Sequence, residues 1–570
     1  MEDHGIIWCS WKSNEHIEPA LSGDTDLDAL FYAGDRYKVI QVMETCGFML
    51  FSATSHRSYP GVLDFISIDV ISGKVFHIHA HFLLTLGEQN IKSYIFPWNQ
   101  QILDNRTKEK KYTKVYTSDL ETELILLLIR YAIKIRWREY IKYKLKDKFG
   151  NKDFWTEYKW LREKLSDDKG DEILVSHPLK DTLGEAIFED VVNIVNSEPD
   201  LVKMLSLKRN VERQSIDKGW RRLPTVLIPL CMWKNEIRNN AVRLFEKIGI
   251  SQSFITRRRT LHNQGVVVTF LGADGAGKST ITNSIIQSWQ HKIDVPYVYF
   301  GSGDGQKNIL RFLFRLAVRI KTLFQKEGNK EAINKTYKAG TLEEANIRPS
   351  LSTIVSTIIG CIEKKRAMHK VMKLKAQGFI VVCDRWPQNQ AGGINDGPLM
   401  ENYLEHQHVL YRFIARWEQS QFSKICSRLQ PDIVFKLLTS LDVALKRKPE
   451  NNAVRKIIER KIKTLQELEF EEASRVVVID AERPLKNVLQ NVRQEIWSFV
   501  SEKRKYSPFY YECVGLPGAG KTTISKGSGV ISLEEKLEKE SSNVLFFMQS
   551  IISDPVSYVC IFRLLVTRPE

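Results

Sequence analysis

Eight consecutive residues near the middle of the chain have the types and spacing needed to hold the phosphates of a nucleotide. They read Gly272-Ala-Asp-Gly-Ala-Gly-Lys-Ser279, which fits the pattern G-x-x-x-x-G-K-[ST]. Glycines let such a loop wrap around a phosphate, the lysine reaches the β- and γ-phosphates, and the hydroxyl binds Mg²⁺. We therefore expect ATP and Mg²⁺ as cofactors, held by Gly272, Gly275, Gly277, Lys278, Ser279 and Thr280.

The residues on either side of the loop have the patterns that a phosphate-binding loop requires. Residues 266–271 form a β-branched, apolar run that predicts a buried strand, and residues 280–287 have an amphipathic pattern that predicts a helix. A strand, a glycine loop and a helix in this order point the helix N-terminus at the bound anion. A chance match in a glycine turn is the alternative, and these flanks argue against it.

Two further groups of charged residues have the chemistry of phosphoryl transfer. Asp384 and Arg385 follow the apolar run 379–383, so they stand at the C-terminal end of a predicted strand, where open parallel sheets bind ligands. A carboxylate there can hold Mg²⁺, and a guanidinium can clamp a phosphate. Farther along, Arg447 and Arg455 lie in a basic stretch that can act as a mobile lid and bring positive charge to the phosphoryl group. The alternatives are a pair that caps the strand and a solvated helix face.

Taken together, these residues resemble the thymidylate kinase family of P-loop kinases over roughly residues 264–500. The resemblance implies that Asp274, at the family's acidic position inside the loop, binds the sugar of the nucleotide acceptor. Some members carry an arginine at the position of Gly275, so the resemblance implies that Arg447 and Arg455 supply the positive charge here. It also implies that Asp480 lies where the family's last strand passes the adenine.

The chain departs from this family where the acceptor would bind. Trp386 follows Asp384-Arg385 where the family has tyrosine, and residues 299–305 replace the family's Arg-Glu-Pro segment, which helps to shape the base pocket. The pattern is closer to the divergent thymidylate-kinase-like proteins of bacteria. The expected acceptor is a nucleotide or a related phosphate-bearing small molecule. The expected catalytic residues are Lys278, Asp384, Arg385, Arg447 and Arg455, with Ser279 and Asp384 as ligands of Mg²⁺.

A second candidate site lies near the N-terminus. Asp26 and Asp28 are two positions apart in a predicted strand, which puts both carboxylates on one face. Such a pair can hold Mg²⁺ against a nucleoside triphosphate. With Gly23 ahead of it, this Asp-x-Asp resembles the motif of the nucleotidyltransferase superfamily over about the first 100 residues. The resemblance implies an α+β domain, with the helices that often follow that fold.

Active members of that superfamily usually carry a third carboxylate on a neighbouring strand. The predicted hairpin, 65–71 and 74–82, instead offers His77, His79 and His81 on one face of its second strand. Asp64 and Asp69 lie on or beside the first strand. The imidazoles are either metal ligands or a polar face that lines a pocket. We expect this domain to be slow or inactive in nucleotidyl transfer.

At 570 residues the chain is too long for one hydrophobic core, so several domains are expected. We expect a nucleotidyltransferase-like α+β domain at 1–117, a helical region at 118–260, a thymidylate-kinase-like P-loop domain at 264–501, and the start of a second, truncated P-loop domain at 506–570. The fold class is α/β, with a parallel sheet that carries helices on both faces. Its strands are expected at 266–271, 295–300, 379–383, 433–438 and 476–479.

The last expected domain rests on a second glycine loop, Gly515-Leu-Pro-Gly-Ala-Gly-Lys-Thr522. The residues that follow it are too few to build a parallel sheet with both faces covered. The alternative is a complete small module that finishes its sheet across a homodimer.

Composition narrows the expected partners and compartment. The net charge is +16, but it is spread along the chain without a single-strand or groove-binding motif, so nucleic acid is not an expected partner. The eight cysteines are scattered without a C-x-x-C pair, which fits a reducing cytosol rather than a zinc motif or a disulfide framework. The longest mainly apolar run, 124–135, is too short to span a bilayer. We expect a cytoplasmic protein.

Three functions remain open on this evidence. ATP-dependent phosphoryl transfer is favoured by Asp274, Asp384-Arg385 and the basic lid. Nucleotidyl transfer with an accessory ATP-binding domain is kept open by Asp26 and Asp28. A non-catalytic ATP-binding switch is kept open by the missing base-pocket segment.

Overall fold

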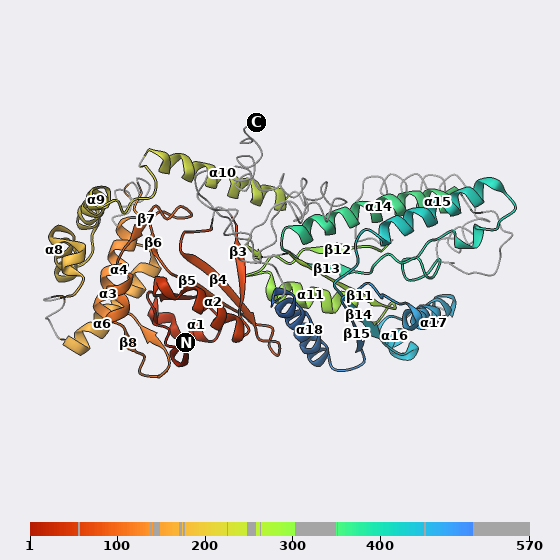
Figure 1. Cartoon of the computed structure of the whole chain (residues 1–570), viewed down its shortest axis with the longest axis horizontal. Helices are drawn as coiled ribbons and strands as arrows, with labels where there is room; N and C mark the ends of the chain where they lie inside the picture. Colours follow the sequence, from red (N-terminus) through yellow and green to blue (C-terminus); the bar gives the residue numbers. More distant parts are fainter. Residues whose placement is uncertain are drawn as a thin grey trace, which may run out of the picture. The chain divides into compact units, whose positions relative to one another are not determined.

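The computed structural model describes residues 1–505 apart from 55–56, 137–139, 141–148, 170–173, 175–176, 225, 248–257, 263, 302–348, 350 and 450–451. The second glycine loop and the expected domain at 506–570 lie outside the described residues. The protein is α/β (Figure 1) and divides into two compact units. The first unit contains Met1–His262, Ser279–Pro296 and Arg483–Trp497, and the second contains Asn263–Lys278, Tyr297–Glu482 and the residues from Ser498 onward.

A mixed sheet of eight strands lies in the first unit, in the order β10-β3-β4-β5-β2-β1-β9-β8. The predicted hairpin is confirmed, because β4 and β5 pair antiparallel across a turn at Gly73, whose φ of 80° suits a residue without a side chain. β2 pairs in parallel with β5, with Asp28 opposite His79. This register brings the Asp-x-Asp motif beside the histidines. The strands are β1 (Trp8–Ser10), β2 (Leu27–Phe31), β3 (Met49–Ala53), β4 (Val62–Ile68), β5 (Val75–His81), β8 (Thr107–Lys108), β9 (Tyr116–Thr117) and β10 (Arg259–Leu261).

Helices of the first unit share a large core of aliphatic and aromatic side chains. α4 (Leu120–Ala132) is buried on nearly every side, which explains the continuous apolar run 124–129 within it. The helical pattern expected after residue 118 continues in α6 (Lys152–Lys169), α7 (Lys180–Leu183), α8 (Glu185–Ser197), α9 (Leu201–Asp217) and α10 (Leu227–Lys247). Shorter elements are α1 (Ile17–Leu21), α2 (Arg36–Thr45), α3 (Asn99–Asp104), β6 (Leu84–Leu86) and β7 (Tyr94–Phe96).

The first unit also takes in residues from distant parts of the chain. Most of α11 (Lys278–Trp289) and the first part of α18 (Leu485–Lys505) belong to it. In α18, Arg493 Nη1 donates to the carbonyl of Ile71 at 3.3 Å, and Trp497 Nε1 donates to the carbonyl of Gly47 at 3.2 Å. The first unit is therefore completed by a helix that lies far from its sheet in sequence.

Five parallel strands form the sheet of the second unit, in the order β12-β13-β11-β14-β15. All five expected strands are confirmed to within one or two residues at each end. The central strands are almost wholly buried, as their mainly apolar sequences predict. The strands are β11 (Val266–Gly272), β12 (Tyr297–Tyr299), β13 (Ile380–Asp384), β14 (Ile433–Leu438) and β15 (Arg475–Asp480).

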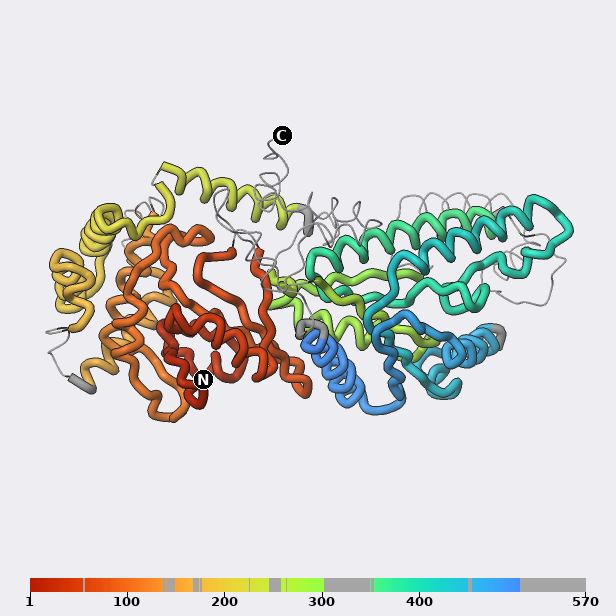
Figure 2. Tube along the Cα trace, in the orientation of Figure 1, coloured from red at the N-terminus to blue at the C-terminus, as the bar shows by residue number. Residues whose placement is uncertain are grey.

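Among the residues that the structure describes, four α-helices lie wholly within the second unit and accompany this sheet. α14 (Leu351–Ala376) and α15 (Val409–Cys426) run side by side (Figure 2), and α16 (Leu441–Arg447) and α17 (Asn452–Glu467) follow β14. Side chains of α14, α15 and α17 share one core cluster with Val267 and Val434, which point to the same face of the sheet. These helices therefore cover that face.

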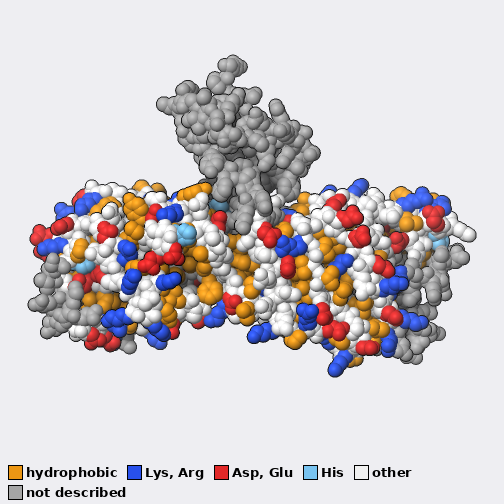
Figure 3. Space-filling model, turned by 60° about the horizontal axis from the view of Figure 1, so that its bottom comes forward, with side chains coloured by type: hydrophobic (Ala, Val, Ile, Leu, Met, Phe, Trp, Pro, Cys, Tyr) orange, Lys and Arg blue, Asp and Glu red, His pale blue; other side chains and the backbone are white. Residues whose placement is uncertain are grey.

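Two features of the described residues concern binding to nucleic acids and membranes: the distribution of surface charge and the apolar character of the helices. On the face drawn in Figure 3, basic and acidic side chains are interspersed rather than gathered into one basic patch. Among the described residues, no helix has both the length and the apolar character needed to cross a bilayer.

Candidate functional site

The glycine loop connects β11 to α11, as its sequence pattern predicts. Gly275 and Gly277 have φ angles of 89° and 88°, a region that residues with a side chain rarely adopt. The tight course of the loop therefore depends on glycine at these two positions. Ser279 and Thr280 follow as exposed residues in the first turn of α11.

Lys278 lies buried inside this loop. Its Nζ donates to the carbonyl of Gly272 at 2.7 Å and to the carbonyl of Ala273 at 2.9 Å. Burial, assisted by the nearby charge of Arg385, lowers the pKa of Lys278 to about 8. The loop thus holds an ammonium group in contact with its own backbone.

Asp384 is the last residue of β13, directly beside the strand that leads into the loop. Its backbone pairs with Phe270 of β11, and the hydroxyl of Tyr297 donates to Asp384 Oδ2 at 3.1 Å. The other oxygen, Oδ1, is buried and has no hydrogen-bond partner among the described residues. Burial raises the pKa of Asp384, and Lys278 opposes that shift. A buried carboxylate oxygen without a partner suits a cation or a proton.

Arg385 links the loop to a second acidic residue. Its Nη2 lies 3.3 Å from Asp274 Oδ1 in the loop, and its Nη1 lies 3.4 Å from Asp396 Oδ2. Asp396 is the main cause that raises the pKa of the guanidinium. Arg385 also has a φ of 69°, which is uncommon for a residue other than glycine. The structure therefore brings Asp274, Asp384 and Arg385 together around the loop.

Lys461 of α17 completes this arrangement, and sequence reasoning did not single it out. Its Nζ donates to Asp274 Oδ2 at 2.7 Å. Burial would raise the pKa of Asp274, but Lys461 and then Arg385 outweigh it and lower the pKa to about 2. Asp274 is therefore an anion flanked by two cations over the neutral pH range.

The two arginines expected to act in a lid, Arg447 on α16 and Arg455 on α17, have surroundings different from those of Lys461. Arg447 Nη2 donates to the carbonyl of Ala481 at 2.9 Å, next to Asp480 at the end of β15. Arg455 is exposed on α17. Ala444 of α16 packs with Ala273 of the loop and Ile458 of α17. The helices α16 and α17 therefore contact the loop, while the basic side chain that reaches Asp274 is Lys461.

In the first unit, the structure assigns different partners to the two carboxylates of the Asp-x-Asp motif. Asp26 lies beside His77 and His79, whereas Asp28 lies 3.0 Å from Lys12 Nζ and 3.2 Å from His81 Nε2. Asp28 is in β2, and Asp26 comes two residues earlier, just before that strand. The expected pair on one face is thus divided between two neighbouring groups of side chains.

Both carboxylates are held as anions by these contacts. Burial opposes ionisation, but His77 and His79 hold the pKa of Asp26 well below its usual range, and Lys12 and His81 do the same for the pKa of Asp28. Burial lowers the pKa of His81 to about 4.

Comparison with known proteins identifies relatives of this chain but does not assign it to a family. No family model matches the chain. It is similar to the uncharacterized ATP-binding protein YghR of Escherichia coli (strain K12), with 24% identity over 243 residues, which cover 42% of this chain and 90% of the relative. It is also similar to the uncharacterized ATP-binding protein YghS of the same strain, with 24% identity over 225 residues, covering 39% of this chain and 89% of the relative.

Proposed function

We propose that this protein binds Mg-ATP at the glycine loop and transfers the γ-phosphoryl group to a nucleotide or a related phosphate-bearing small molecule. The observation that carries the proposal is that Arg385 and Lys461, which come from distant parts of the sequence, converge on the loop that contains Asp274 and Lys278. The names of the relatives support the ATP-binding part. A parallel sheet whose central strand leads into the loop supports a P-loop arrangement.

On the ATP side, the backbone N–H groups of the loop and the ammonium of Lys278 are the expected phosphate ligands. Asp384, with its unpartnered Oδ1 among the described residues, and Ser279, with its exposed side chain, are the residues that would hold Mg²⁺. Carboxylate and hydroxyl oxygens are ligands that this ion prefers, so the donor set fits. When bound, the ion neutralises charge on the phosphate oxygens. Arg447 and Asp480 would border the adenine at the end of β15.

On the acceptor side, Asp274 stands between Arg385 and Lys461. The two cations attract a phosphate group, whereas the ionised carboxylate accepts hydrogen bonds from hydroxyl groups. A ligand that carries both groups satisfies all three side chains. Nucleotides and sugar phosphates are ligands of this kind, which is why we propose this acceptor class.

Calorimetry with the full chain tests the ATP-binding half of the proposal. Wild-type protein is expected to bind Mg-ATP, and Lys278→Ala is expected to bind it much more weakly, because the cation that pairs with the phosphates is lost. Lys424→Ala, an exposed lysine at the end of α15, is the matched control and should bind like wild type. Absence of heat with wild-type protein at millimolar nucleotide would refute the proposal.

Isotope-labelled ATP with a panel of nucleotides and sugar phosphates tests the transfer half. Label in an acceptor, lost in Lys278→Ala, is the expected result. Pyrophosphate release that is lost in Asp28→Ala would instead support nucleotidyl transfer by the first unit. ATP binding without any turnover across the panel would support a switch and contradict the kinase.

A further inference from the structure

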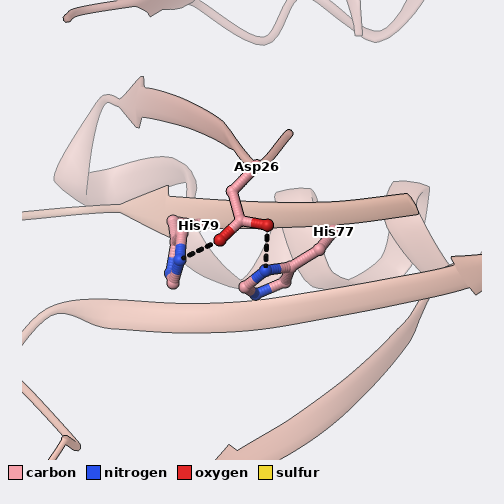
Figure 4. Close-up of side chains that lie close together, drawn as sticks. All are labelled: Asp26, His77 and His79. Atoms are coloured by element: carbon pink, nitrogen blue, oxygen red, sulfur yellow. Dashed lines mark hydrogen bonds and ion pairs between the residues drawn. The ribbon is translucent and has the colours of Figure 1, made fainter. Parts of the chain in front are cut away.

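Two histidines and one aspartate face one another in the first unit. His77 Nδ1 lies 3.0 Å from Asp26 Oδ1, and His79 Nε2 lies 3.3 Å from Asp26 Oδ2 (Figure 4). The two imidazoles alternate along β5, and Asp26 approaches them from the start of the adjacent strand β2. One possible ligand atom from each of the three residues can be chosen so that all three atoms lie within 4.8 Å of one another. These are donor atoms of the kinds that bind transition metals.

The opposite nitrogen of each imidazole points to a fourth residue. Asp64 Oδ1 of β4 lies 2.8 Å from His77 Nε2 and 3.0 Å from His79 Nδ1. Arg259 Nε lies 2.9 Å from the same oxygen of this buried carboxylate. Histidines that bind metals are oriented in this way, by a carboxylate that accepts a hydrogen bond from the N–H of the ring nitrogen away from the metal. Asp64 therefore fixes which nitrogen of each ring faces Asp26.

His77 Nδ1 is a buried nitrogen that lies close to Asp26 without a hydrogen bond of acceptable geometry among the described residues. The whole His77 side chain is buried. A metal ion placed between His77 Nδ1 and Asp26 would bind both of them. Ligands bound at about 2.0–2.1 Å are separated by roughly 2.9 Å in an octahedral site and roughly 3.3 Å in a tetrahedral site. Each imidazole lies in this range from one oxygen of Asp26, at 3.0 Å from Oδ1 for His77 Nδ1 and at 3.3 Å from Oδ2 for His79 Nε2.

We propose that Asp26, His77 and His79 bind one divalent transition-metal ion of the Zn²⁺ type, with Asp64 as the positioning residue behind both imidazoles. Two imidazoles favour such an ion over Mg²⁺, which prefers oxygen ligands. Three protein ligands leave a coordination position open for water or a substrate, as in catalytic zinc sites. Asp28 is not part of this site, because Lys12 and His81 engage it.

One cation in the first unit competes with the metal for the same carboxylate. The ammonium of Lys292 contacts Asp26 Oδ1. A metal bound by this oxygen must displace the ammonium, so Lys292 is expected to weaken metal binding. Replacing Lys292 therefore gives a variant in which the site should become tighter, a change that a merely structural role of these residues does not produce.

The test uses the full chain after treatment with a chelator, without nucleotide. Titration with Zn²⁺ in a calorimeter should show one site that prefers Zn²⁺ to Mg²⁺. His77→Ala and His79→Ala should remove that site, Asp64→Asn should weaken it by roughly 10- to 100-fold, and Lys292→Met should strengthen it. His81→Ala, on the same strand, is the matched control and should leave the affinity unchanged.

Co²⁺ substitution gives a second readout, because its visible absorption reports imidazole coordination in the folded protein. The expected spectrum is lost in Asp26→Asn, a variant that keeps the size of the side chain. Zn²⁺ binding that is unchanged in the His77→Ala/His79→Ala double variant would overturn the proposal. So would a folded wild-type protein that binds no Zn²⁺, or a Lys292→Met variant that binds it no better.

Discussion

If ATP binds at the glycine loop as proposed, the burial of Lys278 affects the proton balance of that binding. The ammonium lies among carbonyls of its own loop and near Arg385, and its pKa falls to about 8. The phosphates of ATP are stronger partners for the charged form, so binding should raise this pKa again. A group whose pKa rises on binding takes up protons at any pH where its free form is partly neutral.

We predict that ATP binding at pH 8 is accompanied by proton uptake, and that the affinity falls as the pH rises through about 8. The sign follows because the charged amine binds phosphate and the neutral amine does not. Calorimetry in two buffers with different ionisation enthalpies measures the uptake. Lys278→Arg is the control, since a guanidinium stays charged in this range. Equal heats for wild-type protein in both buffers would contradict the prediction.

At the scale of elements, α16 restricts the shape of the glycine loop. A Cβ atom on Gly275 would collide with the carbonyl of Ala444, whereas Gly277 has nearly the same φ and no atom within 4 Å of the same point. The two glycines therefore differ in packing and not in backbone conformation. Comparing a substitution at each glycine therefore separates the cost of backbone strain, which both share, from the cost of the contact with α16, which only Gly275 has.

We predict that Gly275→Ala lowers the thermal stability more than Gly277→Ala. Each variant carries the cost of a left-handed backbone, about 1–2 kcal/mol, and only Gly275→Ala also pushes α16 away from the loop. Thermal unfolding of the two variants, monitored side by side, measures the difference. Equal midpoints would show that α16 does not press on Gly275.

A second prediction at the scale of elements concerns the basic side chains of α16 and α17. Arg447→Ala or Arg455→Ala should lower kcat by more than tenfold, about 1.4 kcal/mol, because each removes positive charge that the transferring phosphoryl group requires. Steady-state kinetics with the identified acceptor measures the loss. Lys463→Ala, an exposed lysine on α17, is the control. Full activity in the Arg447→Ala/Arg455→Ala double variant would assign the role to another cation, with Lys461 the first candidate.

The strands and the loop could be predicted from sequence because local patterns encode them. Mainly apolar runs identify β11, β13 and β14, and fixed glycine spacing identifies Lys278. Lys461 could not be chosen, because α17 contains several basic residues and only its packing shows which one faces Asp274. The different partners of Asp26 and Asp28 could not be predicted from the sequence either. They depend on the parallel register of β2 with β5, which pairs residues far apart in the chain.

At the scale of the whole molecule, the chain contains two glycine loops, and the structure describes the surroundings of the first one. The first has Asp384, Arg385 and Lys461 assembled around it in the second unit, and the second, with Lys521, lies outside the described residues. We predict that ATP binding by the full chain is lost in Lys278→Ala and kept in Lys521→Ala. Equilibrium dialysis gives the stoichiometry of each variant. A drop from two bound nucleotides to one in Lys521→Ala would contradict this and show that the second loop is a working site.

The contacts of Arg493 and Trp497 with the N-terminal sheet have a consequence for synthesis of the protein. The ribosome completes β10 long before it reaches α18, so the first unit lacks its last segment while the sheet of the second unit is still being translated. At about 5–20 residues per second, this interval lasts roughly 10–50 s. During that time the backbone carbonyl of Ile71 lacks its donor Arg493, and the carbonyl of Gly47 keeps the hydroxyl of Ser67 but lacks Trp497. Partly assembled chains of this kind are prone to misassembly.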